Sequence, residues 1–82
     1  MHELGILRHI VKTALFVADK NGIEALKFIS LDVGETSGFV PYYLRKLFPV
    51  AADSFPSLKK TDLIINIVPG NGLVIKEIGY QR

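Results

Sequence analysis

The chain has 82 residues, of which 49% are hydrophobic and 22% are charged, and its formal net charge at pH 7 is +2. This length allows one small domain, and the hydrophobic content is sufficient for a packed core and excludes a disordered chain. The weak net charge, without a basic run longer than Lys59-Lys60, argues against nucleic-acid binding, and the absence of cysteine excludes disulfides, thiolate catalysis and cysteine-ligated zinc.

An amphipathic helix is predicted first, over residues 4–20. Its apolar residues recur at three- and four-residue steps, which is the spacing of one helix face. This stripe consists of Leu4, Leu7, Ile10 or Val11, Ala14, Leu15 and Ala18. Asn21 or Gly22 ends the helix, because either residue can take the left-handed conformation that closes a helix.

The pattern then changes to a period of two over residues 26–33, where β-branched and aromatic residues predict a strand. The first half of this strand is apolar on both alternating faces, so we expect it to be covered on more than one side. Gly34 and the following residues 35–38 form a loop. Pro41 then suits the first turn of a second helix, since its missing N–H group would be unpaired there in any case.

The apolar face of the second helix consists of Leu44, Leu47 and Phe48. Pro49 is expected to break or kink this helix, because proline removes a backbone donor and clashes one turn back. A short helical stretch is expected to resume after it, within residues 50–55. Pro56 and the polar residues that follow it indicate a loop.

Two further strands are predicted over residues 62–68 and 73–80, joined by Pro69-Gly70-Asn71-Gly72. Asn-Gly supplies the positive φ angles of a tight hairpin, so we expect these two strands to pair antiparallel with each other. The expected fold is α+β in the order α-β-α-β-β, with a small three-stranded mixed sheet and two helices on one face. The first two strands flank a helical crossover, which is compatible with a parallel arrangement of the two.

The residues with the clearest potential for chemistry stand at the amino terminus. The α-amine of Met1, the backbone nitrogen that follows it and the imidazole of His2 can reach one metal ion together, and Glu3 can add a nitrogen or an oxygen. This nitrogen-rich set suits Ni(II) or Cu(II) and suits Mg(II) or Ca(II) poorly. The alternative is that the tip is frayed, or that His2 is left from cloning, and has no function.

The other candidates have simpler structural explanations. His9 is either a second ligand or an exposed helix residue, since two helical turns separate it from His2 by about 10 Å. Glu35, Thr36 and Ser37 can orient a substrate, but no histidine or cysteine accompanies them as a nucleophile–base pair. Ser37 fits a turn or a helix cap better. The aromatic residues Phe39, Tyr42, Tyr43 and Phe48 are expected in the core or in an interface, and we expect no enzymatic activity.

Three stretches together resemble one protein family: "MHELGILRHIVKTAL" at the start, "KFISLDVGETSGFVPYYLRKLF", and "GLVIKEIGY" near the end. The sequence is similar over nearly its whole length to the hydrogenase/urease nickel-incorporation family, the HypA metallochaperones. The start matches the family pattern except for Gly5, where serine is usual, and Phe39 replaces a smaller aliphatic residue. The second pattern is matched by Gly34, Glu35, Ser37, Gly38, Val40 and Pro41.

The resemblance implies a nickel-binding accessory protein whose metal ligands are the Met1 α-amine, His2 and Glu3. It implies a maturation GTPase or a nickel-enzyme precursor as partner. Some relatives add a carboxylate just after the second pattern, where this chain has Val40. Relatives also carry a zinc ribbon with two CxxC pairs before the last strand, and here a short turn at about 69–72 replaces it. We therefore expect one nickel-binding-type domain over residues 1–82 and no structural zinc.

Two functions remain open at this point. One is the nickel metallochaperone, and the other is a protein-interaction module that keeps the fold and has lost nickel delivery. A mean hydropathy of +0.31 in so short a chain favours unmet apolar surface and hence a homodimer. The apolar runs are shorter than the ~18 residues of a membrane span, so no membrane contact is expected and the expected location is the cytoplasm.

Overall fold

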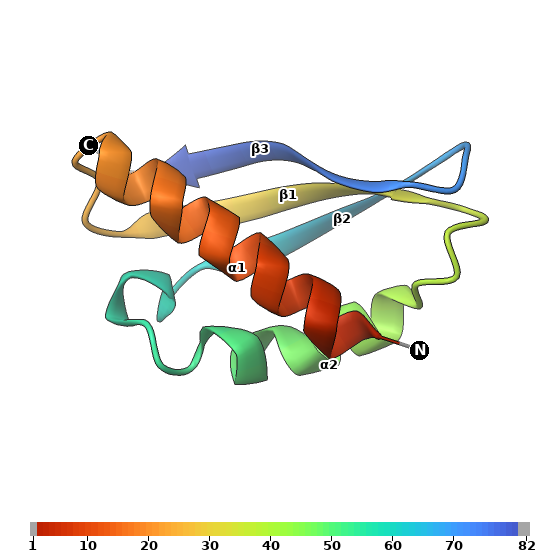
Figure 1. Cartoon of the computed structure of the whole chain (residues 1–82), viewed down its shortest axis with the longest axis horizontal. Coiled ribbons are helices and arrows are strands. Elements are labelled where there is room, and N and C mark those ends of the chain that lie inside the picture. The colour runs from red at the N-terminus through yellow and green to blue at the C-terminus, as the bar shows by residue number, and fades with distance from the viewer. Residues whose placement is uncertain (1, 81–82) are drawn as a thin grey trace.

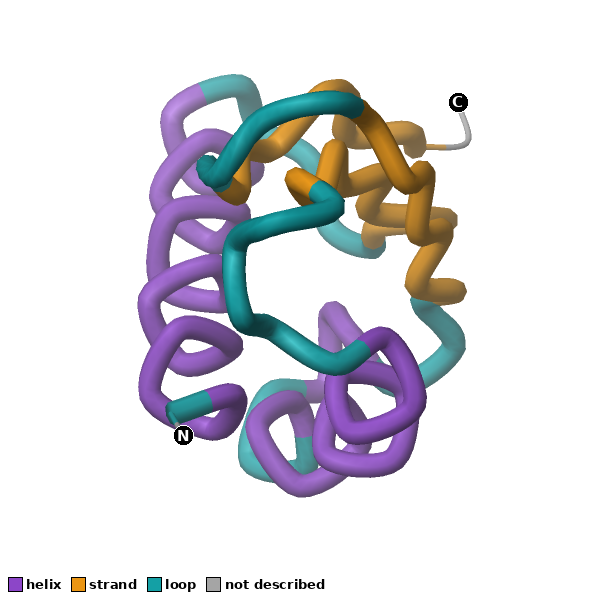
Figure 2. Tube along the Cα trace, turned by 90° about the vertical axis from the view of Figure 1, so that its right-hand side faces the viewer, coloured by secondary structure: helices purple, strands orange, loops and turns teal. Residues whose placement is uncertain are grey.

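The computed structural model describes residues 2–80, which form two helices and a three-stranded mixed sheet (Figure 1). The elements in chain order are α1 (Glu3–Lys20), β1 (Leu26–Gly34), α2 (Pro41–Ala52), the short 3-10 helix η1 (Pro56–Leu58), β2 (Asp62–Val68) and β3 (Leu73–Tyr80). This order and the α+β class confirm the predicted fold. Both helices lie on the same side of the sheet, as the end-on view of Figure 2 shows.

α1 follows the predicted helix closely, beginning one residue earlier and ending at Lys20 as expected. Asn21 closes it, because its side-chain amide donates to the carbonyl of Val17 at 2.8 Å. The chain then turns away at Gly22, whose φ of 67° lies in the left-handed region that glycine adopts without cost. The apolar stripe therefore ends where the sequence indicates.

The core lies between the sheet and the two helices. Ile29, Leu31 and Val33 of β1 are at most 1% exposed, as expected for the inward-facing residues of a central strand. They pack in one cluster with the fully buried Leu7 of α1 and Leu44 of α2. The period-two pattern of β1 and the period-3.6 pattern of the helices thus bury their apolar faces against one another.

α2 continues without a break through Pro49 to Ala52, so of the predicted break or kink at Pro49 the break is wrong. Proline removes the bond to the carbonyl four residues back, which is that of Arg45. Both residues are exposed, so water can satisfy that carbonyl. The buried side chains of Phe48 and Ala51 hold the last turn against the core.

The sheet order is β2-β1-β3, so the predicted hairpin between β2 and β3 is also wrong. β1 pairs in parallel with β2, which the helical crossover allows, and pairs antiparallel with β3. The type I′ hairpin turn that Asn-Gly favours needs positive φ at both central residues. Among residues 2–80, only the glycines Gly22, Gly38 and Gly70 have positive φ, and Asn71 does not.

The four residues 69–72, here called the connector, carry the chain from β2 to β3 across the end of β1. β1 lies between β2 and β3 in the sheet, so the chain must pass over the end of β1 to reach the opposite edge. The backbone of the connector bonds to the end of β1, since the N–H of Gly34 donates to the carbonyl of Gly72 at 2.7 Å. Next to it, the N–H of Glu35 donates to the carbonyl of Val68, the last residue of β2, at 2.8 Å.

Candidate metal centre at the start of α1

His2 is the N-cap residue of α1, and its side chain is exposed. Its backbone carbonyl accepts the first helical hydrogen bond, from the N–H of Ile6 at 3.0 Å. The imidazole makes no capping hydrogen bond. Its Cβ lies 4.0 Å from where a Cβ on Gly5 would stand, which is ordinary van der Waals contact. The main chain of His2 is therefore fixed by the helix, while its imidazole faces solvent.

Glu3, the first residue of α1, is buried, with only 4% of its surface exposed. Its carboxylate oxygen Oε2 accepts a hydrogen bond from the backbone N–H of Val40 at 2.9 Å. Val40 is the N-cap residue of α2, where no side-chain capping bond is made. The Glu3 carboxylate therefore serves the unpaired amino-terminal end of a second helix, where a negative charge is favourable.

The contact with Val40 lowers the pKa of Glu3 from its ordinary value of 4.5, and this effect outweighs the opposing effect of burial. A carboxyl group with a lowered pKa in the folded state stabilises the fold at pH values above 4.5, and this stabilisation is lost as the pH falls through the folded-state pKa. The bond between α1 and the start of α2 is thus strongest at neutral pH.

We expect acid to reduce the advantage of Glu3 over glutamine at the same position. A Glu3→Gln protein keeps a side-chain oxygen for Val40 but carries no charge that acid can remove. The urea midpoint of the wild-type protein should exceed that of Glu3→Gln at pH 7, and the gap should shrink at pH values below 4.5. A gap that stays constant between pH 7 and pH 3 would contradict the assignment.

The Met1 amine lies outside the described residues, so of the predicted ligand set the structure describes only His2 and Glu3. Within residues 2–80, no three histidine, cysteine, aspartate or glutamate side chains gather where they could hold a metal ion. A metal site at this tip therefore needs main-chain nitrogen as well as side chains. The backbone N–H of Glu3 lies in the first turn of α1, where a helix offers it no carbonyl acceptor.

The sequence matches, over residues 1–73, the family model described as hydrogenase/urease nickel incorporation, metallochaperone, HypA. The chain belongs to the HypA family. The matched region contains both the amino-terminal tip and the loop that leads to Val40. The description of this family names the incorporation of nickel into hydrogenase or urease.

A curated relative agrees with this assignment. The chain is 32% identical over 81 residues to the hydrogenase maturation factor HypA of Methanosarcina barkeri, and the match covers 99% of this chain and 59% of that protein. The chain therefore spans less than two thirds of the length of that curated relative.

The fold agrees with two solved HypA structures. It superimposes on the solution structure of the Ni metallochaperone HypA from Helicobacter pylori with a TM-score of 0.88, covering 98% of this chain and 97% of that one at 13% identity. A second HypA solution structure gives a TM-score of 0.72 at 14% identity and covers 100% of this chain and 93% of that one. At these identities, the likeness concerns the fold alone.

The other predicted candidates do not join the tip of this HypA-family domain. His9 is exposed on α1, two helical turns beyond His2. Thr36 donates its hydroxyl to the carbonyl of Gly70 at 2.8 Å. Ser37 accepts from the N–H of Phe39 at 3.2 Å, which confirms a role within a turn.

The aromatic residues divide between core and surface. Phe48 is in the core, whereas Tyr42 and Tyr43 are 63% and 49% exposed, so of the two expected places, core or interface, they are not in the core. Their rings contact each other edge to face with centroids 5.5 Å apart. Lys46 lies over the ring of Tyr42, 5.7 Å from its centroid.

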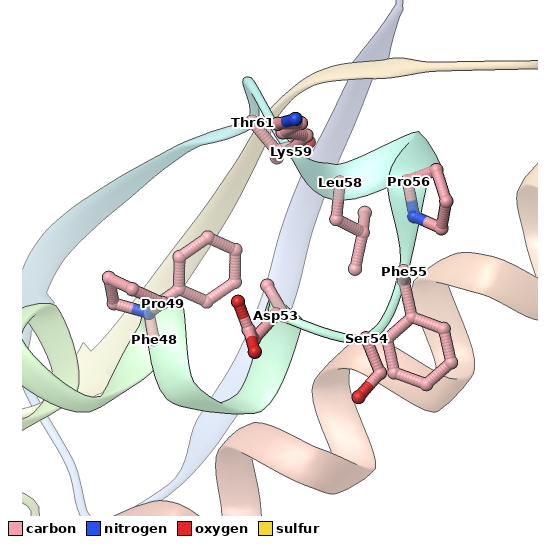
Figure 3. Close-up of a pocket in the computed structure, with 10 residues that line it drawn as sticks. Phe48, Pro49, Asp53, Ser54, Phe55, Pro56, Leu58, Lys59 and Thr61 are labelled. Atoms are coloured by element: carbon pink, nitrogen blue, oxygen red, sulfur yellow. The ribbon is translucent and has the colours of Figure 1, made fainter.

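A cavity of about 420 Å³ lies at the opposite end of α2, about 18 Å from Val40 along a helix of 12 residues (Figure 3). The sequence contains no pattern that predicts it. Its walls are mainly aromatic, aliphatic and proline side chains, with polar groups at Asp53, Ser54, Lys59 and Thr61. No histidine or cysteine lines it.

In the described part of the chain, no helix is long and apolar enough to cross a membrane.

Proposed function

We propose that this chain is a nickel-binding accessory protein that holds one Ni(II) at its amino-terminal tip. The donors are the Met1 α-amine, main-chain nitrogen, and the imidazole of His2, together with Glu3. The observation that carries the proposal is the free, solvent-facing imidazole of His2 on a main chain that α1 holds in place. Membership of the HypA family supports nickel as the metal.

Of the two atoms that Glu3 can offer, we propose the backbone nitrogen. Its carboxylate is already bonded to Val40 at 2.9 Å, and metal binding through that oxygen would leave the amino-terminal end of α2 without its partner. The backbone nitrogen has no carbonyl acceptor within the helix, and its N–H interacts with the carboxylate of the same residue. Planar binding by four nitrogens also suits Ni(II) and Cu(II) among the divalent metals.

Calorimetric titration of Ni(II) into protein with a native, unblocked amino terminus tests the proposal. We expect about one nickel ion per chain at pH 7.5 and weaker binding as the pH falls through about 6–7, because the amine and imidazole must lose their protons and each coordinating backbone amide must release its N–H proton to solvent. A matched sample with residues left in front of Met1 should bind far more weakly. No heat and no visible absorption band with the native terminus would refute the proposal.

We further propose that the chain has no catalytic step of its own and acts in the cytoplasm on a maturation GTPase or a nickel-enzyme precursor. We also propose that residues 1–82 form one nickel-binding-type domain, in which the connector stands in place of the zinc ribbon and no structural zinc is bound. Four residues suffice there, because they need only pass over the end of one strand. The name of the Methanosarcina relative supports a role in hydrogenase maturation.

An interaction module without nickel delivery is the second candidate. It is favoured by large apolar side chains left exposed on both edge strands, with Ile67 of β2 at 55% and Val74 of β3 at 59%. Such surface suits a protein partner or a second copy of the chain. Light scattering over a range of concentrations, together with the nickel titration, separates the candidates. A dimer that binds no nickel supports the module, whereas a monomer that binds nickel supports the metallochaperone.

A further inference from the structure

The loop that runs from the end of β1 to α2, residues 35–40, is tied to the connector at one point. Thr36 makes two bonds to the same carbonyl oxygen of Gly70, from its backbone N–H at 3.0 Å and from its hydroxyl at 2.8 Å. The two segments are 34 residues apart in the sequence. Thr36 is exposed, so these bonds add little to the core and act on the position of the loop.

At its other end, the same loop reaches the start of α1, where the nickel site is proposed. From Thr36 onward it is kept short and bent by two internal bonds, from the N–H of Ser37 to the carbonyl of Gly34 at 3.0 Å and from the N–H of Phe39 to the hydroxyl of Ser37 at 3.2 Å. It ends at Val40, whose N–H is the group that holds the Glu3 carboxylate. An unbroken series of contacts therefore joins the connector to the residue next to His2.

We propose that Thr36 is a positioning residue for the nickel site: its hydroxyl fixes the 35–40 loop on the connector, so that the Val40 N–H stands where Glu3 and the first turn of α1 need it. This inference rests on the proposed nickel function. Thr36 touches no metal ligand itself and acts only through the loop. A loop that keeps only the backbone bond from Thr36 to Gly70 would leave the first turn, and the donors on it, less ordered before the metal arrives, which weakens binding.

The test compares Thr36→Val with Thr61→Val. Each change removes one hydroxyl and keeps the shape, since the hydroxyl of Thr61 donates to the carbonyl of Leu26 at 2.7 Å, at the other end of β1. The two variants lose similar bonds, but only the Thr36 bond leads to Val40. The readouts are the Ni(II) dissociation constant by calorimetry and the hydrogen-exchange rate of the Val40 amide in the metal-free protein.

We expect Thr36→Val to weaken nickel binding and to speed Val40 exchange by about twofold to tenfold each, the factor that one neutral hydrogen bond carries. Thr61→Val should leave both values unchanged. Equal effects of the two variants, or unchanged Val40 exchange in Thr36→Val, would overturn the inference. A wild-type protein that binds no nickel would instead refute the proposed function, and Val40 exchange would still decide whether Thr36 holds the loop against the tip.

Discussion

Replacement of His2 by alanine is expected to weaken nickel binding by about 100-fold or more, the largest effect that we predict for any side chain. Loss of a residue that merely orients a metal ligand already costs 10–100-fold in affinity, and His2 supplies a ligand atom itself. The substitution should not disturb the fold, because the imidazole makes no capping bond and is exposed. The dissociation constant for Ni(II), measured by calorimetry at pH 7.5, gives the result directly.

His9→Ala is the matched control for this experiment. It removes the same side chain from an exposed position on the same helix, two turns away. We expect it to bind nickel as the wild-type protein does, and both variants should keep the wild-type urea midpoint. Equal nickel affinity in His2→Ala and the wild-type protein would rule out the amino-terminal site. A loss in His9→Ala as large as in His2→Ala would move the site along α1.

The proposed metal site could be inferred from the sequence only because its proposed donors are consecutive in the chain. His2 and Glu3 stand together in the chain, so the proximity of their donor atoms follows from covalent geometry alone. The partner of the Glu3 carboxylate is a backbone N–H 37 residues away. A backbone group has no side-chain identity that a sequence pattern could reveal, and the contact depends on how α1 lies against the start of α2.

The elements of the fold were predictable for a related reason. Each helix and strand follows from the local periodicity of its apolar residues, and the helical crossover is compatible with parallel β1 and β2. The order of the strands in the sheet is a non-local property. Asn71-Gly72 is a sound local signal for a hairpin, but β1 lies between β2 and β3 in the sheet, so the two strands that this turn would join are not neighbours. No local pattern in the sequence reveals that order.

The connector therefore depends on a close backbone approach that a hairpin would not need. A Cβ added to Gly34 would meet the carbonyl group of Gly70, coming within 2.7 Å of its carbon and within 2.9 Å of the Asn71 nitrogen. These are backbone atoms, which cannot turn aside as a long side chain does. Gly34 is thus needed for space, at the point where the connector bonds to the end of β1.

We expect Gly34→Ala to destabilise the protein by about 1–3 kcal/mol, the usual cost of forcing extra atoms into a packed site. The connector must shift, and its bonds to Gly34 and Thr36 must lengthen. Gly72→Ala is the control, because no atom outside its own neighbours lies within 4 Å of an added Cβ there. Urea unfolding at pH 7 measures both changes. Equal urea midpoints of the two variants would show that the backbone of the connector does not lie as close to Gly34 as described above.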